Sequence, residues 1–131
     1  MKLSTRLGIC VISLSLWLAG CREVTLLDRS YQRLYIDNFS TPLQSRLPAR
    51  QKYPNSMTLR VTGTVDRAVT LSVYYLEAGK PTYPVLRDSL NAGTYVDHQL
   101  SQDFYSRDEV ELQVTGAPGT TGSLNIEWYC Q

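Results

Sequence analysis

An alternation of apolar and polar residues in four segments constrains the fold more than any other feature of the chain. The segments are 57–65, 69–75, 110–114 and 124–128. A period of two is typical of a β-strand with one face in a core and the other in water. No segment after residue 21 keeps a helical period over three turns. We therefore predict strands at these four places and no long helix.

Five further segments are weaker strand candidates, because they are rich in Tyr, Val and Thr and are bounded by Pro, Gly and Asn. They are 23–27, 31–38, 83–87, 94–98 and 103–105. Short strands at this spacing, without helices between them, favour two packed antiparallel sheets. The predicted fold is an all-β antiparallel β-sandwich, jelly-roll-like or immunoglobulin-like, with about seven to nine strands.

The loop between two of the strong segments is expected to have an odd length. If 61–65 and 69–75 form a hairpin with both apolar sets in the core, inward residues must pair with inward residues. The three-residue loop Asp66-Arg67-Ala68 satisfies this condition. A two-residue loop would turn the second strand inside out.

Two stretches of the chain resemble each other. Residues 57–76 align without a gap on residues 110–129, and five of the twenty positions are identical. Two interpretations stay open. Either two hairpins share a common β pattern, or one hairpin is duplicated in pseudo-symmetric positions of a sandwich.

Two other segments are expected to be irregular. Residues 40–56 contain three prolines, three basic residues and no acidic residue. We interpret this segment as a long exposed loop or an extended stretch that crosses between sheets. Two interpretations of its basic side chains stay open: they are solvated charges on an outward face, or they meet anionic lipid or sugar. Residues 116–122 are rich in glycine and predict a flexible tip.

The first 21 residues have the order of an export signal. Lys2 and Arg6 give a positive start, residues 7–18 are mainly apolar, and small residues precede Cys21. The apolar run is shorter than the roughly 20 residues that a spanning helix needs. The tetrapeptide Leu18-Ala19-Gly20-Cys21 resembles the lipobox of bacterial lipoproteins. Ordinary secretion and an uncut anchor are the alternatives to this resemblance.

The resemblance implies cleavage before Cys21, a diacylglycerol on its sulfur and acylation of the new amine. Residues 1–20 are then a lipoprotein signal peptide, 21–30 a lipid-anchored tether and 31–131 the β-sandwich domain. In lipoproteins of some bacteria an Asp after the cysteine is an inner-membrane retention signal. Arg22 stands there in this chain, so the resemblance implies the outer membrane and leaves its periplasmic or surface face open.

Processing at this site would also set the reach, charge and thiols of the mature chain. Fewer than ten residues separate Cys21 from Tyr31, so the extended tether reaches only about 30 Å. Loss of two basic residues leaves 11 basic against 12 acidic residues, and the net charge falls from +1 to −1. A generic nucleic-acid role therefore lacks an electrostatic basis. Cys130 keeps no disulfide partner, and we expect it to be a buried, inert thiol.

Side chains suited to catalysis or metal binding are sparse. His98 is the only histidine and lies beside Asp97 without an obvious nucleophile, which favours a structural role. Four acidic residues carry oxygens that calcium prefers, but they lack the spacing of an EF-hand loop: Asp97, Asp103, Asp108 and Glu109. We predict no catalytic residue, no metal site and no cofactor, and therefore no enzyme activity.

Tyrosine is the one enriched type of side chain with binding chemistry. All nine tyrosines lie after Cys21, and we single out Tyr74, Tyr83, Tyr95 and Tyr105 as outward or loop-edge ligand-binding candidates. An aromatic face with a polar handle suits contacts to sugars and proteins, although packing within strands also favours tyrosine.

These observations leave two functional classes. The first is a membrane-anchored, non-catalytic binding module for carbohydrate or protein, with several exposed aromatics on a concave face or a loop end. The second is a structural or assembly accessory of an envelope complex, with an apolar or charged patch beside the anchored N-terminus. The membrane is a partner in both.

Overall fold

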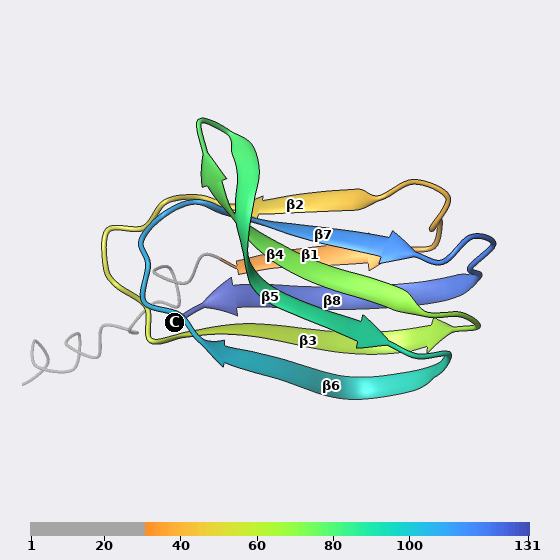
Figure 1. Cartoon of the computed structure of the whole chain (residues 1–131). Coiled ribbons are helices and arrows are strands. Elements are labelled where there is room, and N and C mark those ends of the chain that lie inside the picture. The colour runs from red at the N-terminus through yellow and green to blue at the C-terminus, as the bar shows by residue number, and fades with distance from the viewer. Residues whose placement is uncertain (1–30) are drawn as a thin grey trace, which may run out of the picture.

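The computed structural model describes residues 31–131, which contain no helix. The predicted signal peptide, the tether, the lipidation site Cys21 and the candidate strand 23–27 lie outside the described residues. Eight strands build two four-stranded antiparallel sheets that pack face to face (Figure 1), which confirms the predicted β-sandwich. The strands are β1 Tyr31–Ile36, β2 Leu43–Leu47, β3 Ser56–Val65, β4 Val69–Glu77, β5 Lys80–Leu90, β6 Gly93–Asp103, β7 Val110–Gly116 and β8 Gly122–Cys130.

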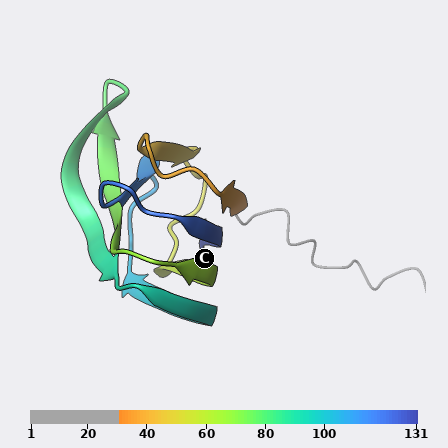
Figure 2. The same ribbon diagram turned by 90° about the vertical axis from the view of Figure 1, so that its right-hand side faces the viewer.

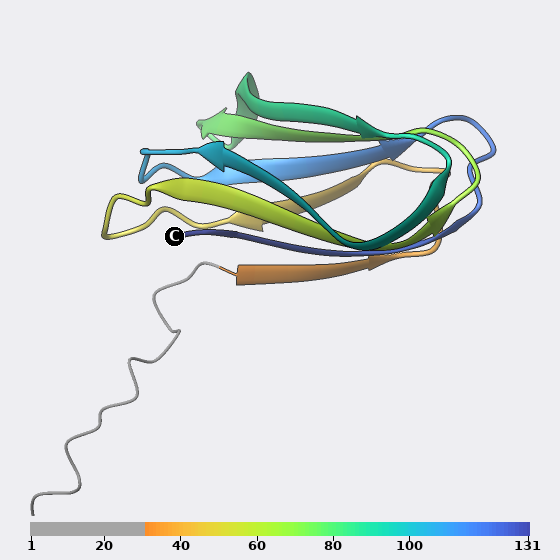
Figure 3. The same ribbon diagram turned by 90° about the horizontal axis from the view of Figure 1, so that it is seen from below.

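The strand order is that of a jelly roll. One sheet runs β1-β8-β3-β6 (sheet A) and the other β2-β7-β4-β5 (sheet B). Each strand of the first half pairs with one of the second half, β1 with β8, β2 with β7, β3 with β6 and β4 with β5. These pairs are all centred near the turn at Ala78 and Gly79, where both residues have positive φ. The domain is one long hairpin rolled into two layers (Figures 2 and 3).

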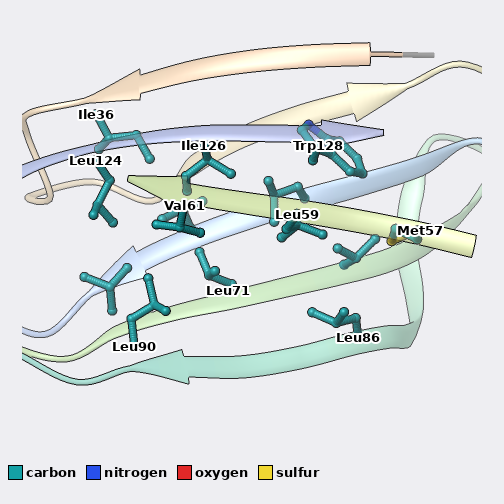
Figure 4. Close-up of a cluster of buried hydrophobic side chains, with 14 of the residues drawn as sticks. Ile36, Met57, Leu59, Val61, Leu71, Leu86, Leu90, Leu124, Ile126 and Trp128 are labelled. Atoms are coloured by element: carbon teal, nitrogen blue, oxygen red, sulfur yellow. The ribbon is translucent and has the colours of Figure 1, made fainter. Parts of the chain in front are cut away.

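The alternating pattern puts one face of each central strand into a shared core. Side chains such as Leu59 of β3 and Ile126 of β8 meet side chains such as Leu71 of β4 from the opposite sheet (Figure 4). Trp128 is fully buried, and its Nε1 donates to Ser45 Oγ at 3.1 Å. A buried indole N–H needs such an acceptor. The four strongest strand predictions are thereby confirmed.

The predicted hairpin between 61–65 and 69–75 is wrong, although its loop has the predicted length. β3 belongs to sheet A and β4 to sheet B, so Asp66-Arg67-Ala68 crosses from one layer to the other. Both apolar sets do face the core. Parity cannot distinguish the two arrangements, because three residues also span the roughly 10 Å between packed sheets.

The two similar segments 57–76 and 110–129 occupy reciprocal positions. Each holds a strand, a crossing between the sheets and most of a second strand. β3 pairs with β8 in sheet A, and β4 pairs with β7 in sheet B. The crossings bond to each other, since Thr121 N donates to Asp66 Oδ1 at 2.7 Å and Ala117 N donates to Ala68 O at 2.9 Å. Each of the two similar segments therefore contains a crossing between the sheets and not a hairpin.

Residues 40–56 are not one long loop, because they contain β2. This short strand pairs with β7 at the edge of sheet B. The chain enters sheet B there from β1 and returns to sheet A through 48–55, so the alternative of an extended stretch between sheets describes it better. Pro42 and Pro48 flank the strand on both sides. Because prolines are typical of loops, they obscure the short strand pattern between them in the sequence.

The weaker candidates in the second half of the chain correspond to longer strands. Segment 83–87 lies inside β5, which tolerates Pro81 and Pro84 because an edge strand needs no second ladder of N–H donors. Segment 94–98 lies inside β6. Segment 103–105 is not a separate strand, because the chain leaves the sheet at Phe104, whose N–H donates to Asn55 O at 3.1 Å.

Gly63 is required where β3 approaches β8 closely. Its φ is +144°, and a Cβ at this position would collide with the backbone oxygen of Ser123. Gly93 has a similar φ of +154°, but nothing lies near its virtual Cβ. We expect Gly63→Ala to destabilise the domain by about 2 kcal/mol more than Gly93→Ala, because only the first adds overpacking to backbone strain.

Urea unfolding of the two glycine variants side by side checks this expectation. The shared positive φ makes Gly93→Ala a matched control for strain. Equal unfolding midpoints for the two variants would contradict the close approach of β3 and β8.

Candidate functional site

An open pocket lies at one end of the sandwich, between the edges of the two sheets. Its volume is about 570 Å³. It is formed by the end of β6, the loop that follows β6, the loop that precedes β3, and the adjoining parts of β4 and β5. The lining side chains are Tyr53, Tyr75, Pro84, Val85, Gln102, Asp103, Phe104, Tyr105 and Ser106.

The floor of the pocket is aromatic and held in place. Phe104 is 2% exposed and stacks on Tyr75, with ring centroids 5.9 Å apart and planes inclined by 25°. Tyr75 is on the same face of β4 as the apolar residues and packs against the core, as the alternation at 69–75 predicts. Gln102 Nε2 donates to Val85 O and thereby joins the edge of β6 to the edge of β5. The floor is therefore part of the folded core.

Two tyrosines stand on the rim. The loop before β3 supplies Tyr53, which is 67% exposed, and the loop after β6 supplies Tyr105, which is 63% exposed. The Arg107 guanidinium carbon lies 4.6 Å from the centroid of the Tyr53 ring, a cation–π arrangement that orients this ring. The rim therefore offers aromatic surface to solvent beside the polar groups of Asp103 and Ser106.

Arg50, in the loop before β3, contacts the loop after β6 and the end of β8. It lies with its guanidinium carbon 5.2 Å from the Phe104 centroid, and its Nη1 donates to Asp108 O at 3.0 Å. Its Nη2 also donates to Cys130 Sγ at 3.1 Å, and its backbone N donates to Arg107 O at 2.8 Å. The pocket loops are thus tied to each other and to the end of β8.

Cys130 is a free and buried thiol, in line with its position on the apolar parity of β8. Burial raises its pKa, while the nearby Arg50 guanidinium opposes this effect. A raised pKa keeps the sulfur protonated and weakly nucleophilic near neutral pH. Cys130 therefore contributes packing and a weak acceptor for Arg50 and lacks the character of a reactive group.

The four tyrosines singled out from the sequence do not form one face. Only Tyr105 lines the pocket. Tyr74 is half-buried on the outer face of sheet B opposite Glu111, and Tyr83 is 71% exposed on β5. Tyr95 lies towards the other end of β6, packs against the core and donates its hydroxyl to Asn91 O at 2.7 Å. The single surface expected from Tyr74, Tyr83, Tyr95 and Tyr105 is therefore not formed.

Sequence reasoning missed Tyr53 as a partner of Tyr105. Tyr53 lies in the proline-rich segment that was expected to be irregular, about fifty positions before Tyr105. The two loops meet because β3 pairs with β6, which places Ser56 opposite Asp103. No local sequence pattern predicts that pairing. The sequence Lys52-Tyr53-Pro54, a tyrosine between a basic residue and a proline, could still have suggested an exposed aromatic side chain in a loop.

The other candidate residues remain separate. His98 is exposed on the edge strand β6, and its ring lies 5.3 Å from that of Tyr95. Asp97 pairs with Arg60 at 2.7 Å on the outer face of sheet A, and this contact lowers the pKa of the Asp97 carboxyl. Within residues 31–131, no three His, Cys, Asp or Glu side chains gather in a way that would hold a metal ion.

Comparison with known proteins adds no relative. No protein-family model matches the chain, and no curated protein matches it. In the part of the chain that the structure describes, no helix is long and apolar enough to cross a bilayer.

The pocket is an open hollow that combines aromatic and polar side chains. Its volume falls within the range of about 300–1,000 Å³ that is common for ligand pockets. Aromatic rings provide apolar faces, and Gln102, Asp103 and Ser106 provide an amide, a carboxyl and a hydroxyl. Such a mixture can hold a ligand that has both apolar and hydroxyl-rich faces.

Proposed function

We propose that this chain is a bacterial lipoprotein, anchored through Cys21, whose β-sandwich is a non-catalytic binding module for carbohydrate. The observation that carries the proposal is the pocket with Tyr53 and Tyr105 on its rim. A sugar ring has a C–H face that stacks on an aromatic ring, and hydroxyls that need polar partners at its edge. Tyr53 and Tyr105 supply the first, and Gln102 and Asp103 supply the second, whereas the Ser106 hydroxyl already donates to Asp108 Oδ2 at 2.7 Å.

The size of the pocket fits a small saccharide. A pocket of about 570 Å³ accommodates a small ligand, whereas a specific protein interface buries about 800 Å² on each side. The proposed module is non-catalytic. Asp103 is the one carboxylate in the pocket lining, so the lining does not offer the pair of carboxylates that glycoside hydrolysis uses, and His98 lies elsewhere on β6. The proposed location is the outer membrane, on the basis of Arg22 after the lipobox.

Binding of the purified domain, residues 22–131, to a panel of glycans tests the carbohydrate part of the proposal. The residues that the structure describes, 31–131, form a buried core that draws on both sheets, so we expect removal of the lipid to leave the fold intact. We expect saturable binding to a subset of the panel. Absence of binding across the whole panel would contradict a carbohydrate ligand.

Replacement of the lipidation site tests the anchor separately. A Cys21→Ser variant cannot carry the thioether-linked lipid, so we expect it to leave the detergent phase in which the natural chain partitions. Continued recovery of Cys21→Ser in the detergent phase would refute lipid anchoring at this position.

One observation favours the alternative role as an assembly accessory. The outer face of β1 and β8, next to the point where the chain enters the domain, carries the exposed tyrosines Tyr31 and Tyr35 and the ion pair Arg33–Glu127 at 2.6 Å. An envelope protein could dock on this face. Co-purification of a stoichiometric envelope partner that is lost in Tyr35→Ala but retained in Tyr105→Ala would favour the accessory role over sugar binding.

A further inference from the structure

The pocket opens at the same end of the sandwich at which the anchored segment enters. β1 begins at Tyr31, which pairs with Tyr129 of β8, and the neighbouring pair joins Met57 to Cys130. At the same end, Asn55 N donates to Gln131 O and Phe104 N donates to Asn55 O. β1 and β6 are opposite edges of sheet A, three strand spacings or about 14 Å apart. Figure 1 shows the start of β1 and the loops before β3 and after β6 together at the left.

The length of the tether restricts how the domain can stand on a membrane. Residues 22–30 extend to at most about 30 Å. The eleven residues of β6 alone span about 36 Å. If the opposite end of the sandwich faced the bilayer, the tether would have to run along the whole domain, which exceeds its reach. The domain therefore stands with its pocket end towards the bilayer or lies on its side.

The rim chemistry favours the orientation with the pocket end towards the bilayer, and the outer face of β1, which carries the exposed Tyr31 and Tyr35, is the competing side-on surface. Exposed aromatic side chains in connecting loops occur, within residues 31–131, at the pocket end, in Tyr53 and Tyr105. The two pocket loops also contain Arg50, Lys52 and Arg107 against Asp108 and Glu109, and Asp103 at the end of β6 adds a third carboxyl at the rim. Tyrosine favours the boundary between head groups and acyl chains, and basic side chains are attracted to anionic head groups.

We propose that the pocket end of the sandwich docks on the head-group layer of an anionic membrane, with Tyr53 and Tyr105 at the interface and Lys52 and Arg107 beside lipid phosphates. The inference rests on the proposed anchoring through Cys21. It places the pocket mouth at the membrane surface, so that the saccharides within reach of the pocket are those carried by lipid head groups.

Fluorescence quenching in vesicles tests this orientation. The lipidated chain is reconstituted in phosphatidylethanolamine and phosphatidylglycerol vesicles that contain a phospholipid with a nitroxide on its head group. One tryptophan is added to Trp128 in each variant, by Tyr53→Trp at the rim, Ala92→Trp at the turn between β5 and β6, or Tyr35→Trp on the outer face of sheet A. All three positions are exposed, and the buried Trp128 gives a constant background.

We expect the nitroxide to quench the tryptophan at position 53 several-fold more strongly than those at positions 92 and 35. Equal quenching at 53 and 92, or stronger quenching at 92, would overturn the proposal. Quenching at 35 as strong as at 53 would show a side-on orientation and would also overturn it. Replacement of phosphatidylglycerol by phosphatidylcholine should weaken quenching at 53, and unchanged quenching would contradict the role of Lys52 and Arg107.

Flotation of the same vesicles separates failure of the docking from failure of the anchor. Protein that does not float with vesicles refutes lipidation at Cys21 and leaves the docking to be measured on the domain coupled through the Cys21 thiol to a maleimide lipid. Protein that floats but shows no preference for position 53 overturns the docking alone.

Discussion

Arg46→Ala should destabilise the domain by about 3 kcal/mol, because it leaves a buried carboxylate without its cation. Glu111 is 1% exposed, and its Oε2 accepts from Arg46 Nε at 2.8 Å. Gln113 Nε2 donates to the other oxygen at 2.9 Å. Loss of a partner from a buried pair costs about 3–5 kcal/mol, and the half-exposed Arg46 places the effect at the lower end. Urea unfolding measures it.

Arg46 also connects two parts of sheet B. Its Nη2 donates to Gly79 O at 3.1 Å, which links edge strand β2 to the turn between β4 and β5. Arg60→Ala is the matched control, since it removes a solvent-exposed pair with Asp97. We expect this control to unfold close to the natural chain. Adding Glu111→Gln to Arg46→Ala should recover stability, and a further loss instead would contradict the buried-charge explanation.

Tyr53→Ala and Tyr105→Ala should each weaken saccharide binding by about tenfold or more, since stacking on an aromatic ring contributes on the order of 1 kcal/mol beyond the burial of its area. Both rings stand on the pocket rim and are mainly exposed, so the substitutions should leave the fold intact. Titration calorimetry with a glycan selected from the panel measures the effect.

Tyr35→Ala is the matched control for this experiment. Tyr35 is 61% exposed, which is close to the exposure of the rim tyrosines, but it lies on the outer face of β1. We expect its removal to leave saccharide affinity unchanged. Equal losses in Tyr35→Ala and Tyr105→Ala would indicate that exposed tyrosines bind the glycan without the pocket.

The fold could be predicted from the sequence to the level of its class and its central strands. The alternation of apolar and polar residues at 57–65 or 124–128 indicates which face of each strand is apolar. In a sandwich that apolar face points into the one core that both sheets share. For the same reason alternation does not report which sheet a strand joins. The sequence therefore predicts a hairpin at Asp66-Arg67-Ala68, where the structure has a crossing between the sheets.

The candidate site was less accessible to sequence reasoning. The sequence predicts Tyr105 as a tyrosine at a loop edge, but the residues that surround it depend on long-range pairing of β3 with β6 and on the approach of β5 to β6. Tyr74 and Tyr95 have the same local character as Tyr105, and tertiary packing half-buries them. Composition therefore indicated the type of side chain, and the jelly-roll topology determined which tyrosines meet.

Chemical-shift mapping of the isotope-labelled domain during titration with a bound glycan tests the central claim most directly. The account predicts saturable shifts that concentrate on the backbone amides of Tyr53, Val85, Gln102, Phe104, Tyr105 and Ser106. Shifts confined to the outer faces of the sheets, or to the loops at the end opposite the pocket, would contradict it.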